Sequence, residues 1–496
     1  MPRWITKTLL CLFIMGFPAI ACGQIAIKHY ARQRIHPDSA DTEYYGRNHF
    51  WRAAGEVVGF NIGLWAFDRY IVNGDYARIS FHSIKENFKH GFKWDNDKLN
   101  TNMFMHPYNG SLYYTAGRSN GFNFWQSSLF AIGGSAMWEL FMECEYPSTN
   151  DIIATPIGGT AIGEVSYRAS DAIIDDRTSG SERIGREVSV FLISPIRGLT
   201  RLLTGDAWRV RPTRGRQFGT PSVATEISVG MRCLQFEREA NHSEWGAAID
   251  FNLEYGERFK VKSTNPYDYF TLSVGINAMN GQPLLSHLEI KGRLLGRELM
   301  EEKDYKLNVG LYQHFDFFDS DTIRNGVSRC PYKLGVPASL GGGIMFRANE
   351  NPYCHFDAYA HLNGVILGSV LSDYYMVDDR NYNLASGFGV KAGLNVVLGR
   401  DRLSLTLDHH LYRLFTWKGY HRNTDLSEVN YKTLDVLGDQ SVATFSVTEF
   451  RTDAKIWKQL YGTFKLSYYY RSTHYRDYSH ISSSSFGLKF MLTYKF

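Results

Sequence analysis

The chain has 496 residues and a formal net charge of +4, from 54 basic and 50 acidic side chains. Because the acids nearly balance the bases, the sequence predicts no nucleic-acid partner. Aromatic residues make up 15% of the chain although the mean hydropathy is slightly negative. This combination is typical of a membrane β-barrel, in which half of each strand faces a wet lumen and aromatic side chains line both interfaces.

The N-terminus has the pattern of an export signal. Arg3 and Lys7 precede an apolar run, Leu9–Ala21, and small residues follow it, so residues 1–23 are predicted to be a signal peptide that is cleaved before Gln24. Cleavage before Cys22, which would give a lipid-anchored N-terminus, is the alternative. Residues 24–47 are polar and mixed and are predicted to be a flexible lead.

Residues 48–215 are predicted to form an α-helical domain. An apolar stripe of helical period begins at His49 and runs to Tyr70. Further helices are expected at Ile79–Phe92, at Trp125–Glu145, from Thr155 to about Asp175, and within Ser181–Gly205. Pro, Asn and Gly in Trp94–Asn102 and Met105–Ser111 predict turns.

Residues 222–496 are predicted to form an outer-membrane β-barrel of about twelve antiparallel strands, since the hydrophobic period changes to two. In the second strand, Trp245 to Tyr255 alternate with polar or small residues, the pattern of a barrel around water. The expected strands are 223–234, 245–255, 269–278, 284–295, 305–317, 334–346, 356–367, 388–398, 403–415, 442–450, 460–470 and 486–496.

The last strand, Phe486–Phe496, is apolar at every second residue and ends on an aromatic. It resembles the signal by which the barrel-assembly machinery recognises outer-membrane barrels. Both ends of such a barrel lie in the periplasm, so odd-numbered hairpins should be long and even-numbered ones short. The connections Asp319–Pro331, Ser369–Asn383, Thr416–Gln440 and Arg471–Ser485 follow this rule, whereas Glu257–Asp268 is too long for its class.

The segment from Trp94 to Glu164 resembles an uncharacterised family of outer-membrane proteins from Bacteroides-like bacteria. The residues that carry the resemblance are His106–Ser111, Arg118–Gly121, Trp138–Glu139, Asn150–Asp151, Thr155–Gly159 and Gly163–Glu164. The resemblance covers roughly the helical third of the chain. It implies a location in the cell envelope and no established activity.

Ionisable residues within this segment lie among apolar, small and aromatic neighbours. His106, Glu139, Glu143 and Glu164 are candidate catalytic residues, since buried carboxylates near a histidine can act as general acid and base or hold a divalent metal. Candidate ligand-binding residues are Ser111, Arg118, Asn120 and Asp151. The structural alternative makes Asp151 a helix cap, leaves Glu143 solvated, and pairs Arg118 or Arg168 with Glu139 or Glu164. The sequence identifies neither the metal nor a cofactor.

Two further features of the sequence point less strongly to a functional site than the ionisable residues of the helical domain do. Asp408 and His410 are expected on the lumen face of the ninth strand and His409 on the lipid face, where an interfacial histidine is the default interpretation. Cys330 and Cys354 are expected near opposite rims of the barrel, which argues against a disulfide between them.

The sequence therefore predicts a protein of the Gram-negative outer membrane that contacts membrane lipid, with its helical domain in the periplasm or in the barrel lumen. A barrel of this size is either filled by side chains or leaves a narrow passage. The function expected first is a structural, lipid-binding or channel role. The alternative is a membrane-associated hydrolase or lipid-modifying enzyme that uses His106 with Glu139, Glu143 or Glu164.

Overall fold

The computed structural model describes residues 47–496, apart from 237–242, 262–264, 280–281, 303, 321, 325–326, 330, 349–350, 352 and 432. The expected signal peptide, both expected cleavage sites and nearly all of the lead lie outside these residues, as does Cys330. Cys354 is a free thiol at the start of a strand.

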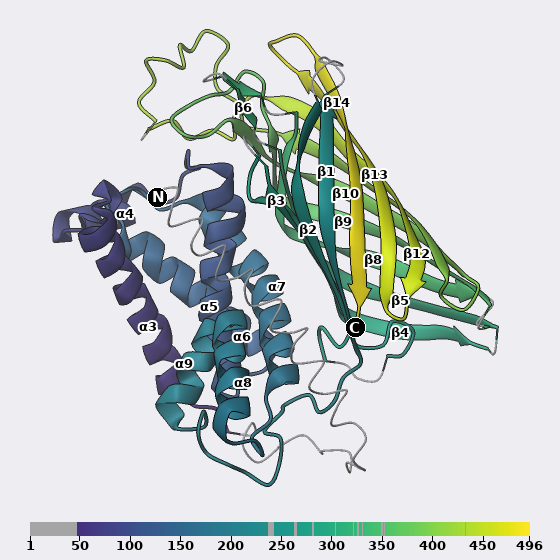
Figure 1. Ribbon diagram of the computed structural model, residues 1–496. Coiled ribbons are helices and arrows are strands. Elements are labelled where there is room, and N and C mark those ends of the chain that lie inside the picture. Colours follow the sequence, from purple (N-terminus) through teal and green to yellow (C-terminus); the bar gives the residue numbers. More distant parts are fainter. Residues whose placement is uncertain are drawn as a thin grey trace. The chain divides into compact units, whose positions relative to one another are not determined.

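The chain forms two compact units. One consists of the residues up to Asp95 together with Phe104–Ser222, and the other consists of Asn96–Met103 together with Val223–Phe496. The first unit is helical and the second is a β-barrel (Figure 1). Each is described by itself below.

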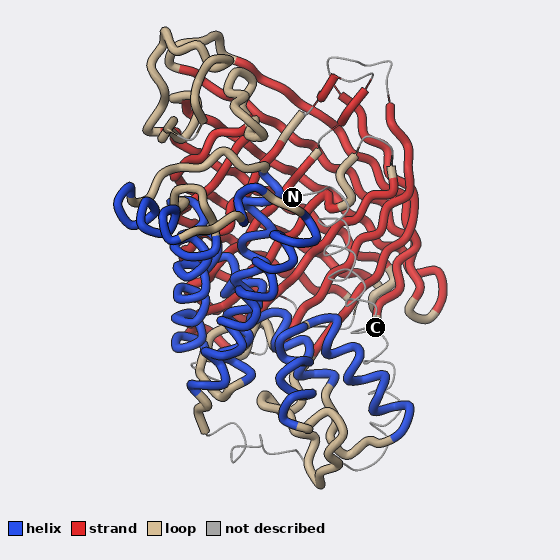
Figure 2. Tube along the Cα trace, turned by 90° about the vertical axis from the view of Figure 1, so that its left-hand side faces the viewer, coloured by secondary structure: helices blue, strands red, loops and turns tan. Residues whose placement is uncertain are grey.

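Seven α-helices and several shorter turns make up the described part of the helical unit (blue in Figure 2). The α-helices are α3 (Phe50–Phe67), α4 (Phe81–His90), α5 (His106–Ser119), α6 (Phe124–Met137), α7 (Thr149–Ile173), α8 (Gly180–Ile193) and α9 (Pro195–Thr204). The shorter turns are the π-helical η1 (Asp68–Val72) and η4 (Trp138–Met142), and the 3-10 turn η2 (Asp75–Ala77). A further π-helical turn, η3 (Thr101–Met105), lies where the chain passes from the barrel unit into the helical unit. None of the described helices combines the length and apolar character that are needed to cross a membrane.

Local sequence explains most helix ends. Ser80 and Asn123 close capping boxes at α4 and α6, and the Ser148 hydroxyl accepts the Asp151 amide at the start of α7. The turn predicted at Met105–Ser111 was wrong, because these residues enter α5. Pro107 occupies the first turn of that helix, where its missing N–H costs no hydrogen bond.

The predicted barrel is confirmed. Twelve antiparallel strands close into one sheet, in which β1 pairs with β14. The strands are β1 (Val223–Phe236), β2 (Ser243–Tyr255), β3 (Phe270–Ala278), β4 (Leu285–Glu301), β5 (Tyr305–Asp319), β8 (Lys333–Ala348), β9 (Cys354–Leu371), β10 (Tyr382–Leu398), β11 (Leu403–Thr416), β12 (Ser441–Trp457), β13 (Leu460–Tyr475) and β14 (Ile481–Lys495). A separate hairpin, β6 (Thr322–Arg324) with β7 (Val327–Arg329), interrupts the β5–β8 connection and was not predicted.

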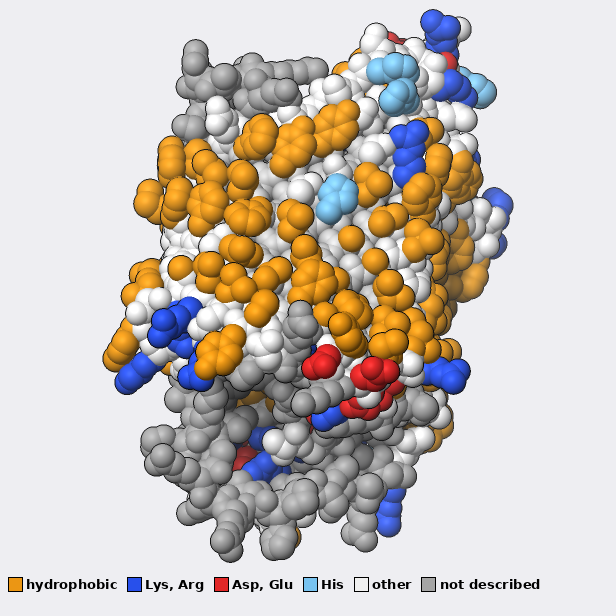
Figure 3. Space-filling model, turned by 90° about the vertical axis from the view of Figure 1, so that its right-hand side faces the viewer, with side chains coloured by type: hydrophobic (Ala, Val, Ile, Leu, Met, Phe, Trp, Pro, Cys, Tyr) orange, Lys and Arg blue, Asp and Glu red, His pale blue; other side chains and the backbone are white. Residues whose placement is uncertain are grey.

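Side chains alternate between the lumen and the outer surface. In β14, Phe486, Phe490, Leu492 and Tyr494 are exposed, whereas Lys489, Met491 and Thr493 between them are buried. Apolar side chains gather on the outer wall of the barrel in Figure 3, as expected for a surface that faces lipid. The predicted alternation is therefore confirmed in this strand.

The connections at one end of the barrel fold into a compact cap. The β9–β10 and β11–β12 connections share a small apolar core of Tyr375, Val377, Tyr420 and Val436. Arg471, on the lumen side of β13, holds Asp373 of this cap with two contacts of 2.6 Å. The segment Asn96–Met103 belongs to the same unit, and the Tyr375 hydroxyl donates to Asn96.

The connection between β2 and β3, which is too long for its class, extends a side chain into the barrel. Its Arg258 pairs with Glu254 at 3.0 Å and with Asp357 of β9 at 3.4 Å. The connection thus places a guanidinium among carboxylates of the lumen just after β2 ends.

Candidate functional site

The interior of the helical unit contains a buried ion pair centred on Glu164 of α7. Arg118 of α5 and Arg168 of α7 donate to its two carboxylate oxygens at 2.8 and 2.7 Å, and the Tyr114 hydroxyl donates at 2.8 Å. Burial by itself raises the pKa of Glu164, but the two guanidiniums outweigh burial and lower it. The geometry thus favours a structural role for Glu164 and Arg118 as a permanently charged anchor between α5 and α7.

A different group of candidate residues converges nearby in the same unit. His106 begins α5, Glu139 lies in the π-helical turn η4, and Asp151 lies in the first turn of α7. One donor atom from each lies within 4.8 Å of the others. His106 Nε2 and Asp151 Oδ2 are 3.6 Å apart, which is too far for a hydrogen bond. We call these three residues the His106 cluster.

Electrostatics in the His106 cluster are unusual for a buried site. Burial, together with the negative charges of Asp95 and Glu139, raises the pKa of Asp151 well above its usual range. Burial also lowers the pKa of His106, and Asp95 acts in the opposite direction. The chain thus brings together acidic groups that repel one another and an imidazole that burial keeps neutral.

The remaining predicted residues take part in local packing. Trp138 Nε1 donates to the Glu143 carboxylate, and Ser111 Oγ donates to the Tyr108 carbonyl within α5 at 2.6 Å. Asn120 donates to Glu56 at 2.8 Å and accepts from Arg52. The structure therefore brings His106, Glu139 and Asp151 together and places Glu143, Ser111 and Asn120 in separate contacts.

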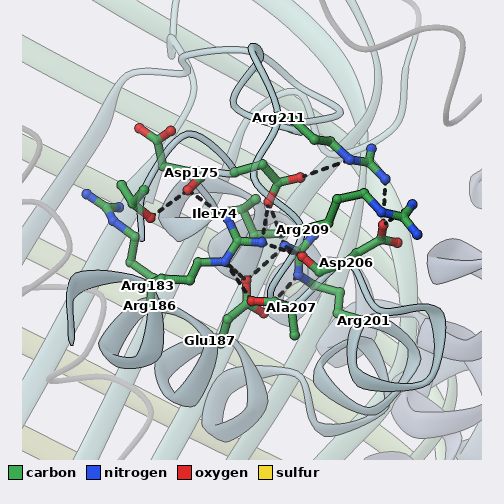
Figure 4. Close-up of polar contacts among 12 residues, drawn as sticks. Ile174, Asp175, Arg183, Arg186, Glu187, Arg201, Asp206, Ala207, Arg209 and Arg211 are labelled. Atoms are coloured by element: carbon green, nitrogen blue, oxygen red, sulfur yellow. Dashed lines mark hydrogen bonds and ion pairs between the residues drawn. The ribbon is translucent and has the colours of Figure 1, made fainter. Parts of the chain in front are cut away.

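An arginine-rich network that the sequence analysis missed fastens α8 and α9 to the end of α7 (Figure 4). Arg183 and Arg201 both contact Asp176, at 3.0 and 2.6 Å, and both contact Glu187. Arg183 also donates to the carbonyl of Ala207 at 2.8 Å. The signal in the sequence was the density of arginines between residues 183 and 216, which only the fold pairs with acids from α7 and α8.

Several helices of this unit bury charged or polar residues beside small and apolar ones, and expose large apolar residues. In α3 the buried face carries Glu56 and Asn61, and the exposed face carries Trp51, which is 84% exposed. In α8 the buried face carries Arg183 and Arg186. Large exposed apolar side chains of the unit include Trp51, Val58, Ile62, Trp125, Leu129, Ile132, Ile184, Val188, Phe191, Leu199, Leu202, Leu203 and Trp208. Exposed apolar faces of this kind differ from the helix amphipathicity usual in soluble proteins, in which the outer face is polar.

The barrel lumen contains a chamber of about 320 Å³ with a charged lining. Glu226, Glu254 and Asn395 place it toward the end of the barrel where the chain enters β1 and leaves β14. Its lining includes ion pairs, such as Lys465 with Glu449 at 2.8 Å, and polar contacts. His410 Nδ1 lies 3.0 Å from Glu289, and the Tyr359 hydroxyl donates to Asp408 at 2.7 Å.

An aromatic layer borders this chamber on the side away from the end at which the chain enters β1. Its members are Phe318, Tyr332, Tyr412, Phe445 and Tyr469, all of them buried. The Phe445 ring lies 5.8 to 6.3 Å from those of Phe318, Tyr332 and Tyr412, and Tyr332 stacks on Tyr469 at 4.2 Å. Side chains therefore fill the lumen at this level, one of the two states expected for a barrel of this size.

The sequence predicted correctly which side chains of one strand face this lumen. Asp408 and His410 line the chamber and His409 is exposed, as predicted. Their partners Glu289 and Tyr359 come from β4 and β9, far away in the sequence. Alternation predicts which residues of a strand face the lumen, but not which residues of distant strands meet there.

Comparison with known proteins identifies only part of the chain. Residues 91–196 match the family described as "Domain of unknown function (DUF3943)". This match covers about a fifth of the chain, includes the whole His106 cluster, and carries no activity with it. No curated protein matches the chain.

Solved structures that are similar to the chain include an outer-membrane channel, a transporter and a porin. The channel DcaP of Acinetobacter baumannii is 10% identical, with 56% of this chain and 97% of that chain covered and a TM-score of 0.23. The toluene transporter TodX of Pseudomonas putida is 7% identical, with 55% and 89% covered and a TM-score of 0.22. The porin NanC is 9% identical, with 54% and 100% covered and a TM-score of 0.25. The evidence that this chain forms a barrel is its own strand pairing, in which β1 closes the sheet against β14.

Proposed function

We propose that this chain is an outer-membrane barrel protein whose helical unit binds membrane lipid. The observation that carries the proposal is the set of large apolar side chains that α3, α6, α8 and α9 expose, while α3, α8 and α9 bury charged residues. In water, large apolar side chains on so many helix surfaces would be costly, whereas in lipid they are expected, and ionisable groups then face the interior.

Two features of the exposed face support a lipid partner. Three of its largest side chains are tryptophans, Trp51, Trp125 and Trp208, and indole rings favour the boundary between headgroups and acyl chains. The polar groups that lipid would exclude are already paired inside the unit, as in the Glu164 ion pair and the arginine-rich network. A helical unit lying in one leaflet is consistent with the absence of a spanning helix among the described residues.

Lipid contact is measurable with bimane attached to single cysteines in the full chain, in a background without the native cysteines and in vesicles of brominated lipid. Probes at Leu129 and Val188, both exposed and apolar, should be quenched strongly. A probe at Ser179, an exposed polar residue before α8, is the control. Equal quenching at all three positions would contradict lipid binding by this face.

A second candidate function, a gated channel for small polar solutes, is favoured by the lumen. The chamber presents acids and bases to a solute, and the aromatic layer closes the path beyond it. Opening would require these rings and the loop cap to move, and the cap is fastened by Arg471 and Asp373.

Conductance across planar bilayers tests this second candidate. Replacing Phe318 and Phe445 by Ala removes the centre of the aromatic layer, so the double variant should conduct where the wild type stays closed. The control is Phe450→Ala, which changes an outward-facing ring of β12, the strand that also carries Phe445. A double variant that folds and remains silent would remove the channel proposal.

The same proposal places the barrel in the outer membrane of a Gram-negative envelope. Apolar side chains on its outer wall support that location, and the alternation in β14 supports recognition of this strand by the barrel-assembly machinery. Cell fractionation tests the location. Recovery of the full-length protein with inner-membrane or soluble fractions would contradict it.

A further inference from the structure

We propose that the His106 cluster binds one divalent transition-metal ion through His106, Glu139 and Asp151. This site lies wholly within the helical unit and is independent of both lipid contact and conduction. Its three donor residues come from α5, η4 and α7. A bound ion would therefore cross-link three elements that only the tertiary fold brings together.

The spacing of the donors suits co-ligands better than a hydrogen-bonded pair. Two ligands held at about 2.1 Å from a tetrahedral ion lie about 3.4 Å from each other. His106 Nε2 and Asp151 Oδ2 are 3.6 Å apart, and all three donor atoms fall within 4.8 Å of one another. Small side-chain rotations would bring the set onto one ion.

Charge supplies a second, independent reason. Asp151 and Glu139 are 2% exposed, and Asp95 is a third carboxylate close by, because Asn150 Nδ2 donates both to it and to Asp151. Collecting carboxylates in a low-dielectric interior is unfavourable because like charges repel and are poorly solvated there. A divalent cation removes this repulsion, since it becomes the largest local charge.

Neighbouring groups orient the carboxylates in the manner usual for ligands. Asn150 Nδ2 donates to Asp151 Oδ1 at 3.1 Å, which leaves Oδ2 as the oxygen nearest the imidazole. The Ser148 amide donates to Glu139 Oε2 at 2.7 Å. Asn150 also exchanges two hydrogen bonds with Asp95, at 3.0 and 3.1 Å. Such outer contacts fix ligand orientation and raise affinity.

The donor types select the class of metal. Calcium and magnesium prefer sites made only of oxygen, whereas imidazole suits zinc, iron and manganese sites that also contain carboxylates. One imidazole with two carboxylates, and Asp95 beside them, therefore predicts Zn²⁺ or Mn²⁺ ahead of Ca²⁺ or Mg²⁺.

The test uses the full-length protein in detergent, stripped with a chelator and titrated with Zn²⁺ or Mn²⁺ while heat and bound metal are measured. Wild type should bind one ion per chain more tightly than the variants do. His106→Ala and Asp151→Asn should each weaken that binding by about 100-fold or more. His82→Ala, an exposed histidine of α4, and Glu143→Gln, a carboxylate outside the cluster, should leave it unchanged.

Stability provides the second readout and guards against a variant that merely unfolds. Without metal, Asp151→Asn should melt close to the wild type, because asparagine has the same size and keeps an oxygen that can accept from Asn150. Added metal should raise the melting temperature of the helical signal in the wild type and in the two controls, but not in Asp151→Asn. The proposal fails if the wild type binds no ion, or if His106→Ala and Asp151→Asn bind as the controls do.

Discussion

Buried charge in the helical unit is stabilising only where it is paired. Glu164→Gln would leave Arg118 and Arg168 without their anion, and breaking a buried ion pair in this way costs about 3–5 kcal/mol. We expect the helical unit of this variant to unfold at a lower temperature than that of the wild type. Circular dichroism at 222 nm measures this transition. Glu86→Gln breaks only an exposed pair with Lys89, 3.7 Å long, and should change the stability by less than about 0.5 kcal/mol. Equal effects of the two variants would contradict the structural role of Glu164.

Glu56 should make the stability of the same unit depend on pH. Burial raises its pKa to about 7, although Thr200 and Asn120 donate to it and Arg52 lies nearby. The folded protein therefore keeps a proton that the unfolded chain loses above its ordinary pKa of 4.5. The free energy of unfolding should fall by roughly 3 kcal/mol between pH 4.5 and pH 7 and then level off.

The variant Glu56→Gln isolates this contribution. A glutamine can still accept from Asn120 and can donate to Thr200, whose own hydroxyl donates to the carbonyl of Ile196 at 2.8 Å. Thermal unfolding at pH 5 and pH 8 should then show a smaller difference for the variant than for the wild type, with a gain at pH 8. An unchanged pH dependence would show that Glu56 is not the responsible group.

At the scale of elements, close helix packing depends on particular glycines. A Cβ on Gly134 of α6 would lie 2.4 Å from the Tyr113 ring, whereas a Cβ on its neighbour Gly133 meets nothing within 4 Å. We expect Gly134→Ala to destabilise the helical unit by about 1–3 kcal/mol through overpacking. Gly133→Ala should stabilise it by about 0.5–1 kcal/mol through helix propensity. Opposite shifts in melting temperature would confirm this packing, and shifts of the same sign would refute it.

Sequence reasoning succeeded where one periodic signal decides the structure. Each predicted barrel strand overlaps one observed strand, because an alternation that separates lipid from lumen is strong and local. Most helices were located, although the start of α5 was predicted as a turn. Their faces were not predicted, since a period of 3.6 is the same whether the apolar side faces a core or lipid. His106, Glu139 and Asp151 were among the candidates proposed from residue types, but which of them meet depended on where α5 and α7 cross.

At the scale of the whole molecule, barrel closure depends on contacts across the seam between β1 and β14. Asp250 of β2 accepts from Lys489 of β14 at 2.6 Å and from Lys465 of β13 at 3.1 Å, all three side chains being buried in the lumen. One carboxylate of the second strand thus reaches over β1 and links β2 to the last two strands on the inside of the wall. Lys465 keeps a second acid, Glu449, at 2.8 Å.

Asp250→Asn should therefore weaken the closed barrel, with a loss of about 3–5 kcal/mol because it leaves buried ammonium groups poorly paired. The measurement is the temperature at which the protein ceases to migrate as a folded barrel in SDS gels. Asp401→Asn is the control, since Asp401 is exposed in the β10–β11 turn and its positive φ of 65° suits asparagine. The helical signal of Asp250→Asn should melt as in the wild type, because its contacts lie within the barrel. A barrel transition that is unchanged in Asp250→Asn would mean that strand pairing alone holds the seam.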